Sequence, residues 1–301
     1  MKRLAVILCV VASVVCANAK ILRVSNVNGS TAPYSTIKDA LEAAEDGDVI
    51  MVDASPDSYG DVEINKTVTL QGPGYWLIDN GIIQEGMQTA SFGTINMTAS
   101  GAKVSSASAR AINPKGDGCV ITRCHVSNIG LGDGIKGAII HQNYINVSVG
   151  GPSYFNILPS NIQITNNIFR TGIGDLRAFC NSIIKYNTFT AKSYNTAFWC
   201  LENSLFENNI ADFDLLNNNG GNSFVNTQRY PDGFGYNSKD IDCGIMASDA
   251  SISTEHGAFA GDDPYVISGI APGPYIEDIT VPVSVVQGNE MKVTVKIGTS
   301  R

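Results

Sequence analysis

Few residues of this chain carry charge, and few are cysteine or histidine. Only 16% of the 301 residues are Asp, Glu, Lys or Arg, and the formal net charge is −8. An acidic balance argues against nucleic acid and anionic membrane surfaces as partners, because both attract basic proteins. No C-x-x-C pair occurs, and no spacing of histidine and cysteine is typical of zinc, so the sequence predicts no metal centre of that kind.

The first 19 residues are predicted to be a secretory signal peptide. Two basic residues precede an apolar run at 4–15, and Ala17-Asn18-Ala19 forms an A-x-A cleavage site before Lys20. The apolar run is too short to cross a bilayer, and no later segment is long enough. We therefore expect a mature protein without a transmembrane segment that is secreted, periplasmic or held at the cell surface.

Cysteine usage is compatible with export but fixes no pairing. After cleavage, Cys119, Cys124, Cys180, Cys200 and Cys243 remain, too few for a disulfide scaffold in a chain of this length. Cys16 would be the attachment site if the protein were a lipoprotein. The valine before it is larger than the small residue of a lipobox, so cleavage after residue 19 is the preferred interpretation.

Residues 34–74 predict a helix followed by short strands. Ser35 is a candidate cap, and apolar residues at positions 37, 40, 41 and 44 have helical spacing, so we expect a helix at 35–45. Asp46-Gly47-Asp48 ends this helix. A buried strand at 49–52 and two alternating segments separated by turns follow.

The middle of the chain repeats one strand pattern. Four to six residues recur at intervals of 19 to 24 residues. The copies are Val120–Cys124, Ile139–Asn143, Ile162–Asn167, Ile183–Asn187, Leu205–Asn209 and a weaker Phe224–Gln228. A period near 20 residues is typical of a solenoid, whereas a β-propeller blade needs roughly 40. The pattern that leucine-rich repeats require is missing.

Two of these patterns resemble a known family. The segment Tyr34–Gly74 and the repeated pair of asparagines between apolar residues, as at Ile164–Phe169, resemble the right-handed parallel β-helices of the pectin-lyase-like superfamily. The resemblance covers about residues 34–228 and implies an all-β solenoid at 20–265, closed at one end by the helix. It implies no single activity, because this fold carries lyases, hydrolases, esterases, epimerases and non-catalytic surface proteins.

The tail at 266–301 has a different pattern. Residues 229–265 are rich in loop-forming types, and two strands are expected at Ile279–Val286 and Met291–Ile297. Alternation in the second strand predicts that one of its faces is buried. The tail is similar to endings of secreted β-helix proteins from Bacteroidetes-type bacteria. We expect a short hairpin that covers the solenoid or docks on a surface partner.

Stacking turns the repeat into a set of expected contacts. Successive coils lie about 4.8 Å apart, so corresponding residues sit above one another. The asparagines that end the repeats are expected to form a buried ladder of side-chain amides, made by Asn143, Asn167, Asn187 and Asn209. Cys180 and Cys200 are expected to stack as well, either as a disulfide or as two buried free thiols.

Two aromatic residues are the first candidates for ligand binding. If Cys180 and Cys200 point inward, Phe179 and Trp199 point outward and stack as a flat apolar platform. Sugar rings bind such platforms through their C–H faces, so the pair indicates a polysaccharide partner. The alternatives are that a loop covers both rings, or that Trp199 points inward and Cys200 outward.

An outward row of polar residues is the second candidate. His141, Thr165, Lys185 and Glu207 take the same position in successive repeats. A lysine held by a carboxylate has the chemistry of a general base for β-elimination from a uronic acid. The alternative is a cross-strand ion pair without a catalytic role, worth about 0.2–1 kcal/mol.

Two pairs of aspartates complete the candidates. Asp212 and Asp214 flank Phe213 at a separation of roughly 6–7 Å, near the short end of the inverting glycosidase range. Hydrolases of the resembled family add a third aspartate from a neighbouring coil, and none aligns here. Asp240 and Asp242 have side chains that suit calcium, although such residues more often brace a loop.

Three functional hypotheses follow from these patterns. The preferred one is a secreted, non-catalytic protein that contacts polysaccharide along its coil face. The second is a carbohydrate-active enzyme, a lyase or a hydrolase, that uses the charged residues named above. The third is a structural cell-surface protein. No cofactor is expected, and calcium is the one metal that the sequence leaves open.

Overall fold

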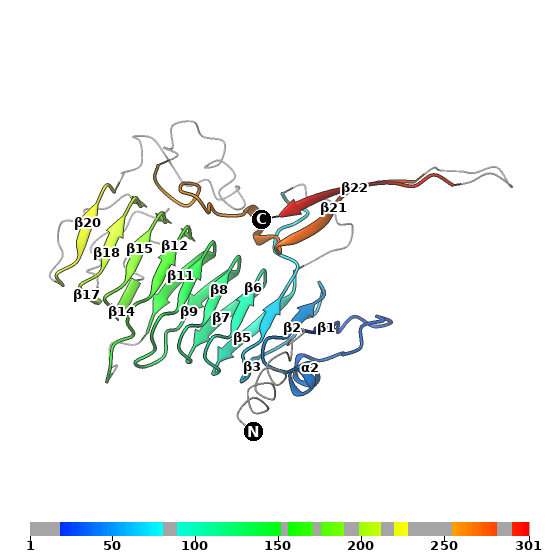
Figure 1. Ribbon diagram of the computed structural model, residues 1–301, viewed down its shortest axis with the longest axis horizontal. Coiled ribbons are helices and arrows are strands. Elements are labelled where there is room, and N and C mark those ends of the chain that lie inside the picture. Colours follow the sequence, from blue (N-terminus) through cyan, green and yellow to red (C-terminus); the bar gives the residue numbers. More distant parts are fainter. Residues whose placement is uncertain are drawn as a thin grey trace, which may run out of the picture.

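The predicted fold class is confirmed by a computed structural model, which describes residues 19–80, 89–151, 156–170, 176–189, 199–211, 220–227, 255–281 and 291–300. These residues form a right-handed parallel β-helix with a short α-helix at its first coil (Figure 1). An antiparallel hairpin follows the coils in sequence. Most coils contribute one strand to a first sheet and, after a tight turn, one strand to a second sheet.

The first sheet has ten strands in the described part of the chain, all paired in parallel. In spatial order they are β1 (Ile21–Val24), β2 (Val49–Val52), β4 (Thr69–Gln71), β6 (Lys103–Ser105), β8 (Val120–Thr122), β10 (Ile139–His141), β12 (Gln163–Thr165), β15 (Ile183–Lys185), β18 (Leu205–Glu207) and β20 (Ser223–Val225). From β4 onward the middle residue of each short strand points into the solenoid. Ile140, Ile164 and Ile184 thus stack in register, fully buried.

The second sheet is also parallel and runs alongside the first. Its main strands in sequence order are β3 (Val62–Ile64), β5 (Ser91–Met97), β7 (Ser108–Pro114), β9 (His125–Ile129), β11 (Tyr144–Gly150), β13 (Ile168–Phe169), β16 (Thr188–Phe189) and β19 (Ile210–Ala211). Two further strands continue it, because β14 (Leu176–Cys180) pairs with the end of β11 and β17 (Trp199–Glu202) pairs with β14. Aromatic rings stack inside, as between Phe169 and Phe189, whose centroids are 4.6 Å apart.

The turn between the two sheets contains the predicted asparagine ladder. Asn167 Oδ1 accepts hydrogen bonds from the backbone N–H and the side-chain amide of Asn143, at 2.8 and 3.0 Å. Asn187 and Asn209 repeat this arrangement one and two coils further on. The ladder is therefore confirmed, and all four amides are buried.

The left-handed backbone of this turn lies one residue earlier than expected. The positive φ angles fall on the residues that precede the ladder asparagines, for example +56° at Gln142 and +54° at Tyr186. The ladder asparagines themselves do not have positive φ, so their role is to bind the neighbouring coil. The left-handed residues direct their own side chains outward.

The helix expected at 35–45 forms at α2 (Ile37–Ala43) and closes the first coil. Its N-cap is Thr36, whose Oγ1 accepts from Asp39 N at 3.1 Å, and not Ser35 as expected. The apolar face of α2 packs on the core through Ile37 and Leu41. Capping by Thr36 satisfies one of the donors that every helix start leaves open.

A return segment, residues 255–270, runs back along the turns between the sheets. Its bonds to successive coils are Gly257 N to Asn208 O (2.9 Å), Asn166 Nδ2 to Ala260 O (2.8 Å), Gln142 Nε2 to Pro264 O (2.6 Å) and Arg123 Nη1 to Ile270 O (3.0 Å). Each coil residue in this set has left-handed backbone. The sequence indicated only loops here, so the return segment is a feature that the repeat pattern did not predict.

The hairpin consists of β21 (Gly273–Thr280) and β22 (Thr294–Ser300). A hairpin was expected, but its first strand begins earlier than predicted, at Gly273. The expectation that one face of the second strand is buried is wrong, because Met291, Val293, Val295 and Ile297 are 44–65% exposed. Figure 1 shows why: the hairpin extends away from the stacked coils and does not lie across them.

Candidate functional site

The predicted polar row exists in the first sheet. His141, Thr165, Lys185 and Glu207 are register partners in four successive strands. Lys185 Nζ lies 3.0 Å from Glu207 Oε2, and both side chains are about one third exposed, at 32% and 30%. The adjacency that the repeat predicted is therefore present.

The electrostatics of Lys185 and Glu207 favour a structural ion pair over a catalytic general base. The hydrogen bond to Glu207 raises the pKa of Lys185 above its ordinary value, so the amine is protonated at neutral pH. A general base needs a neutral amine, and the Glu207 contact works against that. The ring of Tyr186 lies 4.9 Å from Lys185 Nζ and also stabilises the cation.

His141 is engaged through both of its ring nitrogens. Nδ1 lies 2.8 Å from Thr165 Oγ1, and Nε2 lies 3.0 Å from Asp263 Oδ2 of the return segment. Burial lowers the pKa of His141, and the neighbouring Asp263 partly offsets this. His141 thus helps to attach the return segment to the coils, and it lies two coils away from Lys185.

The predicted aromatic platform does not form, and this is a correction. Phe179 is fully buried and pairs in register with Leu201, whereas Trp199 pairs with Arg177. The cause is Ala178, whose φ of +58° breaks the alternation of β14 and turns the next side chain inward. The side chain of Trp199 lies outside the described residues.

The predicted stacking of Cys180 on Cys200 is also wrong. Cys180 is a free, half-buried cysteine whose register partner is Glu202. The two similar phrases around these cysteines are therefore offset by two residues when the coils stack. Because Cys180 and Cys200 are not register partners, the disulfide expected between stacked cysteines does not form.

The aspartate candidates Asp212, Asp214, Asp240 and Asp242 lie outside the described residues. Within the described ranges, no group of three or more histidine, cysteine, aspartate or glutamate side chains is placed to hold a metal ion.

A groove that the sequence analysis missed crosses several coils of the second sheet. It has a volume of about 630 Å³ and lies at the C-terminal ends of β7, β9 and β11, beside the start of β14. The polar side chains that line it are Asn113, Lys115, Asn128, Ser148 and Arg177. We call it the glycine groove, because Gly130, Gly132, Gly150 and Gly151 line it as well.

Glycine is required in this groove because neighbouring coils approach closely. A Cβ at Gly130 would lie 2.5 Å from Asn113 Oδ1, and one at Gly132 would lie 3.1 Å from the Pro114 carbonyl oxygen. Gly150 has φ +135° and its Cβ would collide with the Arg177 carbonyl. These glycines therefore allow the neighbouring coils to approach closely where the groove lies.

Stacked polar side chains stand along the groove. Asn113 Nδ2 donates to Asn96 Oδ1 at 3.1 Å, and Ser148 Oγ donates to Asn128 Oδ1 at 2.9 Å. An amide has two donors and an acceptor with two lone pairs, so one such bond leaves capacity for a ligand hydroxyl. The two pairs, Asn96 with Asn113 and Asn128 with Ser148, are offset by two residues along the strands and therefore present neutral donors and acceptors at two positions.

The charged residues that line the groove are both basic. Lys115 and Arg177 are exposed, and among the residues that the structure describes no acidic side chain lines the groove. This contrasts with the formal net charge of −8 for the chain. The signal in the sequence was an asparagine or serine followed by glycine at the end of three successive strands, in "NPKG", "NIGLG" and "SVGG".

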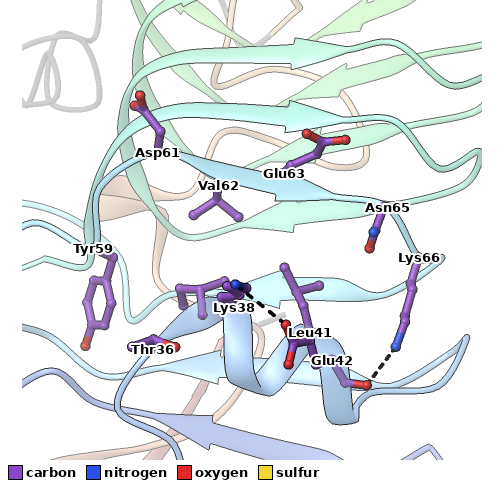
Figure 2. Close-up of a pocket in the computed structure, with 11 residues that line it drawn as sticks. Thr36, Lys38, Leu41, Glu42, Tyr59, Asp61, Val62, Glu63, Asn65 and Lys66 are labelled. Atoms are coloured by element: carbon purple, nitrogen blue, oxygen red, sulfur yellow. Dashed lines mark hydrogen bonds and ion pairs between the residues drawn. The ribbon is translucent and has the colours of Figure 1, made fainter.

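A second cleft lies between α2 and β3 and has a volume of about 700 Å³ (Figure 2). Leu41 and Val62 point into it, while Asp61 and Glu63 point away (Figure 2). Both lysines of this cleft have partners within the protein. Lys38 forms an ion pair with Glu42 at 3.9 Å, and Lys66 Nζ donates hydrogen bonds to backbone carbonyls at the end of α2. The two lysines of this cleft are therefore engaged in the protein's own contacts, whereas Lys115 and Arg177 are exposed in the glycine groove.

A polar cluster on the outer face of the second sheet supports a loop. His125 Nδ1 lies 3.2 Å from Ser108 Oγ, and His125 Nε2 lies 2.8 Å from Asn146 Nδ2. The ring centroids of His125 and Trp76 are 4.6 Å apart. Burial lowers the pKa of His125 to about 4, so this imidazole is neutral at physiological pH. The cluster holds the loop that carries Trp76 against the coils.

The fold and the groove place the protein in a class, the parallel β-solenoids with a polar groove across their coils. Comparison with protein-family models, with curated protein sequences and with solved structures gives no match. No helix among the described residues has the length and apolar character needed to cross a membrane. The class therefore rests on the geometry of the chain itself.

Proposed function

We propose that this protein is a secreted, non-catalytic β-helix of the pectin-lyase-like type that binds a polysaccharide in the glycine groove. The observation that carries the proposal is the groove itself, with its glycines, its hydrogen-bonded amides and its two basic side chains. An extended glycan is a repeating polar chain, and successive coils present a repeating polar surface at about 4.8 Å intervals. The predicted signal peptide supports export.

The charges of the groove favour an acidic polysaccharide. Lys115 and Arg177 flank the amides of Asn113 and Asn128, so carboxylates or sulfates of a glycan would meet cations while its hydroxyls meet amides. Arg and Lys form charge-assisted hydrogen bonds with such anions. A neutral glycan would use the amides alone and should bind less tightly.

The test is a binding titration with acidic and neutral polysaccharides. The variant Lys115→Ala/Arg177→Ala should bind an acidic polysaccharide at least about tenfold more weakly, which corresponds to the loss of one or two charged contacts. Lys103→Ala is a matched control, because Lys103 is an exposed lysine on β6 of the other sheet. Wild-type protein that binds no polysaccharide, or a double variant that binds as wild type does, would refute the proposal.

The enzymatic alternative has one supporting observation, the contact between Lys185 and Glu207. If the protein were a lyase that uses this pair, an acidic polysaccharide would acquire unsaturated ends, and Lys185→Ala would abolish them. If it were a hydrolase, new reducing ends would form and Asp214→Asn would remove them. We expect neither product, and turnover that depends on either residue would replace the binding proposal with an enzymatic one.

A further inference from the structure

The hairpin β21–β22 is an amphipathic ribbon. Ile279 lies opposite Val295 and Thr280 lies opposite Thr294 in the antiparallel register. Residues that lie directly opposite one another share a face, and successive residues alternate between faces. One face is therefore aliphatic and the other carries threonine and lysine.

The aliphatic face is exposed along its length. Ile279 (51%), Val295 (46%) and Ile297 (65%) belong to it within the paired strands, with the exposed fraction in parentheses. Val281 (51%), Met291 (58%) and Val293 (44%) continue the same alternation beyond the paired residues and are exposed as well. Thr280, Lys292, Thr294 and Lys296 of the other face are exposed as well. Neither face of the ribbon is thus covered by the described coils.

The exposed face is large for a monomer. Six aliphatic residues at this exposure present on the order of 500 Å² of apolar surface, at the upper end for single soluble proteins, where such patches mark interaction sites. A two-stranded hairpin alone in water is marginally stable, and it needs a further layer against its apolar face. The ribbon therefore resembles one layer of a β-sandwich whose apolar face lacks the second layer among the described residues.

We propose that the aliphatic face of the hairpin is a homodimer interface, in which it packs on the same face of a second copy about a twofold axis. Among the described residues this face carries no charged side chain that would select a partner of different chemistry, and a uniform aliphatic surface is complementary to itself. Two such faces together bury about 1,000 Å², which reaches the size that a specific interface needs. Two-stranded layers of this kind pack about 10 Å apart.

The rest of the molecule permits this arrangement. Lys296 lies on the opposite face of the ribbon, and Lys292 follows the same alternation, so both would point outward from the dimer and like charges do not meet in the interface. The hairpin also extends away from the coils, so the two solenoids stay apart (Figure 1). The area is at the lower end for stable dimers, so we expect association in the micromolar range.

Analytical ultracentrifugation of the full mature chain tests the proposal. Wild-type protein should shift from monomer to dimer between low and high micromolar concentration. Val293→Lys/Val295→Lys should remain monomeric over the same range, whereas Thr294→Lys, on the other face of the same strand, should dimerise as wild type does. Wild-type protein that stays monomeric, or a double variant that dimerises normally, would overturn the proposal.

A second measurement avoids variants that distort the hairpin. Hydrogen exchange of wild-type protein should slow at the amides of β21 and β22 as concentration rises, and should stay constant in the coils. A hairpin whose exchange does not depend on protein concentration, but slows when lipid vesicles or another protein is added, would contradict the dimer. Polysaccharide binding by Val293→Lys/Val295→Lys should be unchanged, so failure of the dimer leaves the proposed function intact.

Discussion

The coils and the hairpin have the same alternation of apolar and polar residues but opposite surroundings. Ile184 in β15 is fully buried between Ile164 and Phe206 of the neighbouring coils, whereas Ile297 in β22 is 65% exposed. Both patterns predict which residues share a face. They do not specify what covers that face, because in the coils the next repeat supplies the cover and in the hairpin the described chain supplies none.

The strongest test of this difference truncates one isoleucine to alanine in the coils and one in the hairpin, so that the same side-chain atoms are removed from each. Ile184→Ala should lower the free energy of unfolding by about 2–5 kcal/mol, because it leaves a cavity between two coils. Ile297→Ala, in dilute protein, should change it by less than about 0.5 kcal/mol, as expected for a solvated side chain. Chemical denaturation measures both. Equal effects of the two changes would mean that the hairpin is covered in the monomer.

The outer face of the coils provides a second, pH-dependent test. The pKa of His125 is lowered to about 4 in the folded protein, while an unfolded histidine titrates near 6.5. The unfolded state therefore binds the proton first, and stability should fall as pH decreases from about 6.5 to about 4, by roughly 3 kcal/mol from this group.

Thermal or chemical unfolding measured across this pH range checks the prediction. In His125→Gln this part of the decline should disappear, and a smaller decline from His141, whose pKa is lowered in the same direction, should remain. A variant with the full wild-type pH dependence would show that the loop carrying Trp76 does not bury His125.

The asparagine ladder provides the third and smallest test. Asn187 accepts from the backbone and side-chain amides of Asn167 and donates to the Ile164 carbonyl. Asn187→Ala leaves these buried groups without a partner and should cost about 1–3 kcal/mol. Asn65→Ala, at an exposed position, should be neutral within about 0.5 kcal/mol. A neutral result at Asn187 would mean that water replaces the amide.

The parts of the fold that follow from strict repetition were predictable. The stacked strands, the asparagine ladder and the adjacency of Lys185 with Glu207 all result from one register that repeats coil after coil. The direction of Phe179 was not predictable, because the left-handed backbone of Ala178 interrupts the alternation at that point. A positive φ at alanine leaves no mark in a pattern of apolar and polar residues.

Features that depend on contacts between distant segments were also missed. The return segment bonds to Gln142 and Asn166 largely through backbone carbonyls, which any residue provides, so its sequence carries no periodic signal. Among the described residues, Asp263 is the one side chain that adds to these bonds at Gln142. The glycine groove arises where Gly130 and Gly150 of different coils stand near one another. In the sequence each glycine indicates only a turn. The groove that they form together can be recognised only when the coils are stacked in the structure.

The most direct test of the account is hydrogen exchange of the mature protein with and without an acidic polysaccharide. The account predicts slower exchange at the groove, in peptides covering 113–132, 148–151 and 176–178, and no change in β21 and β22. Slower exchange confined to the hairpin, or no change anywhere in the presence of saturating polysaccharide, would contradict it.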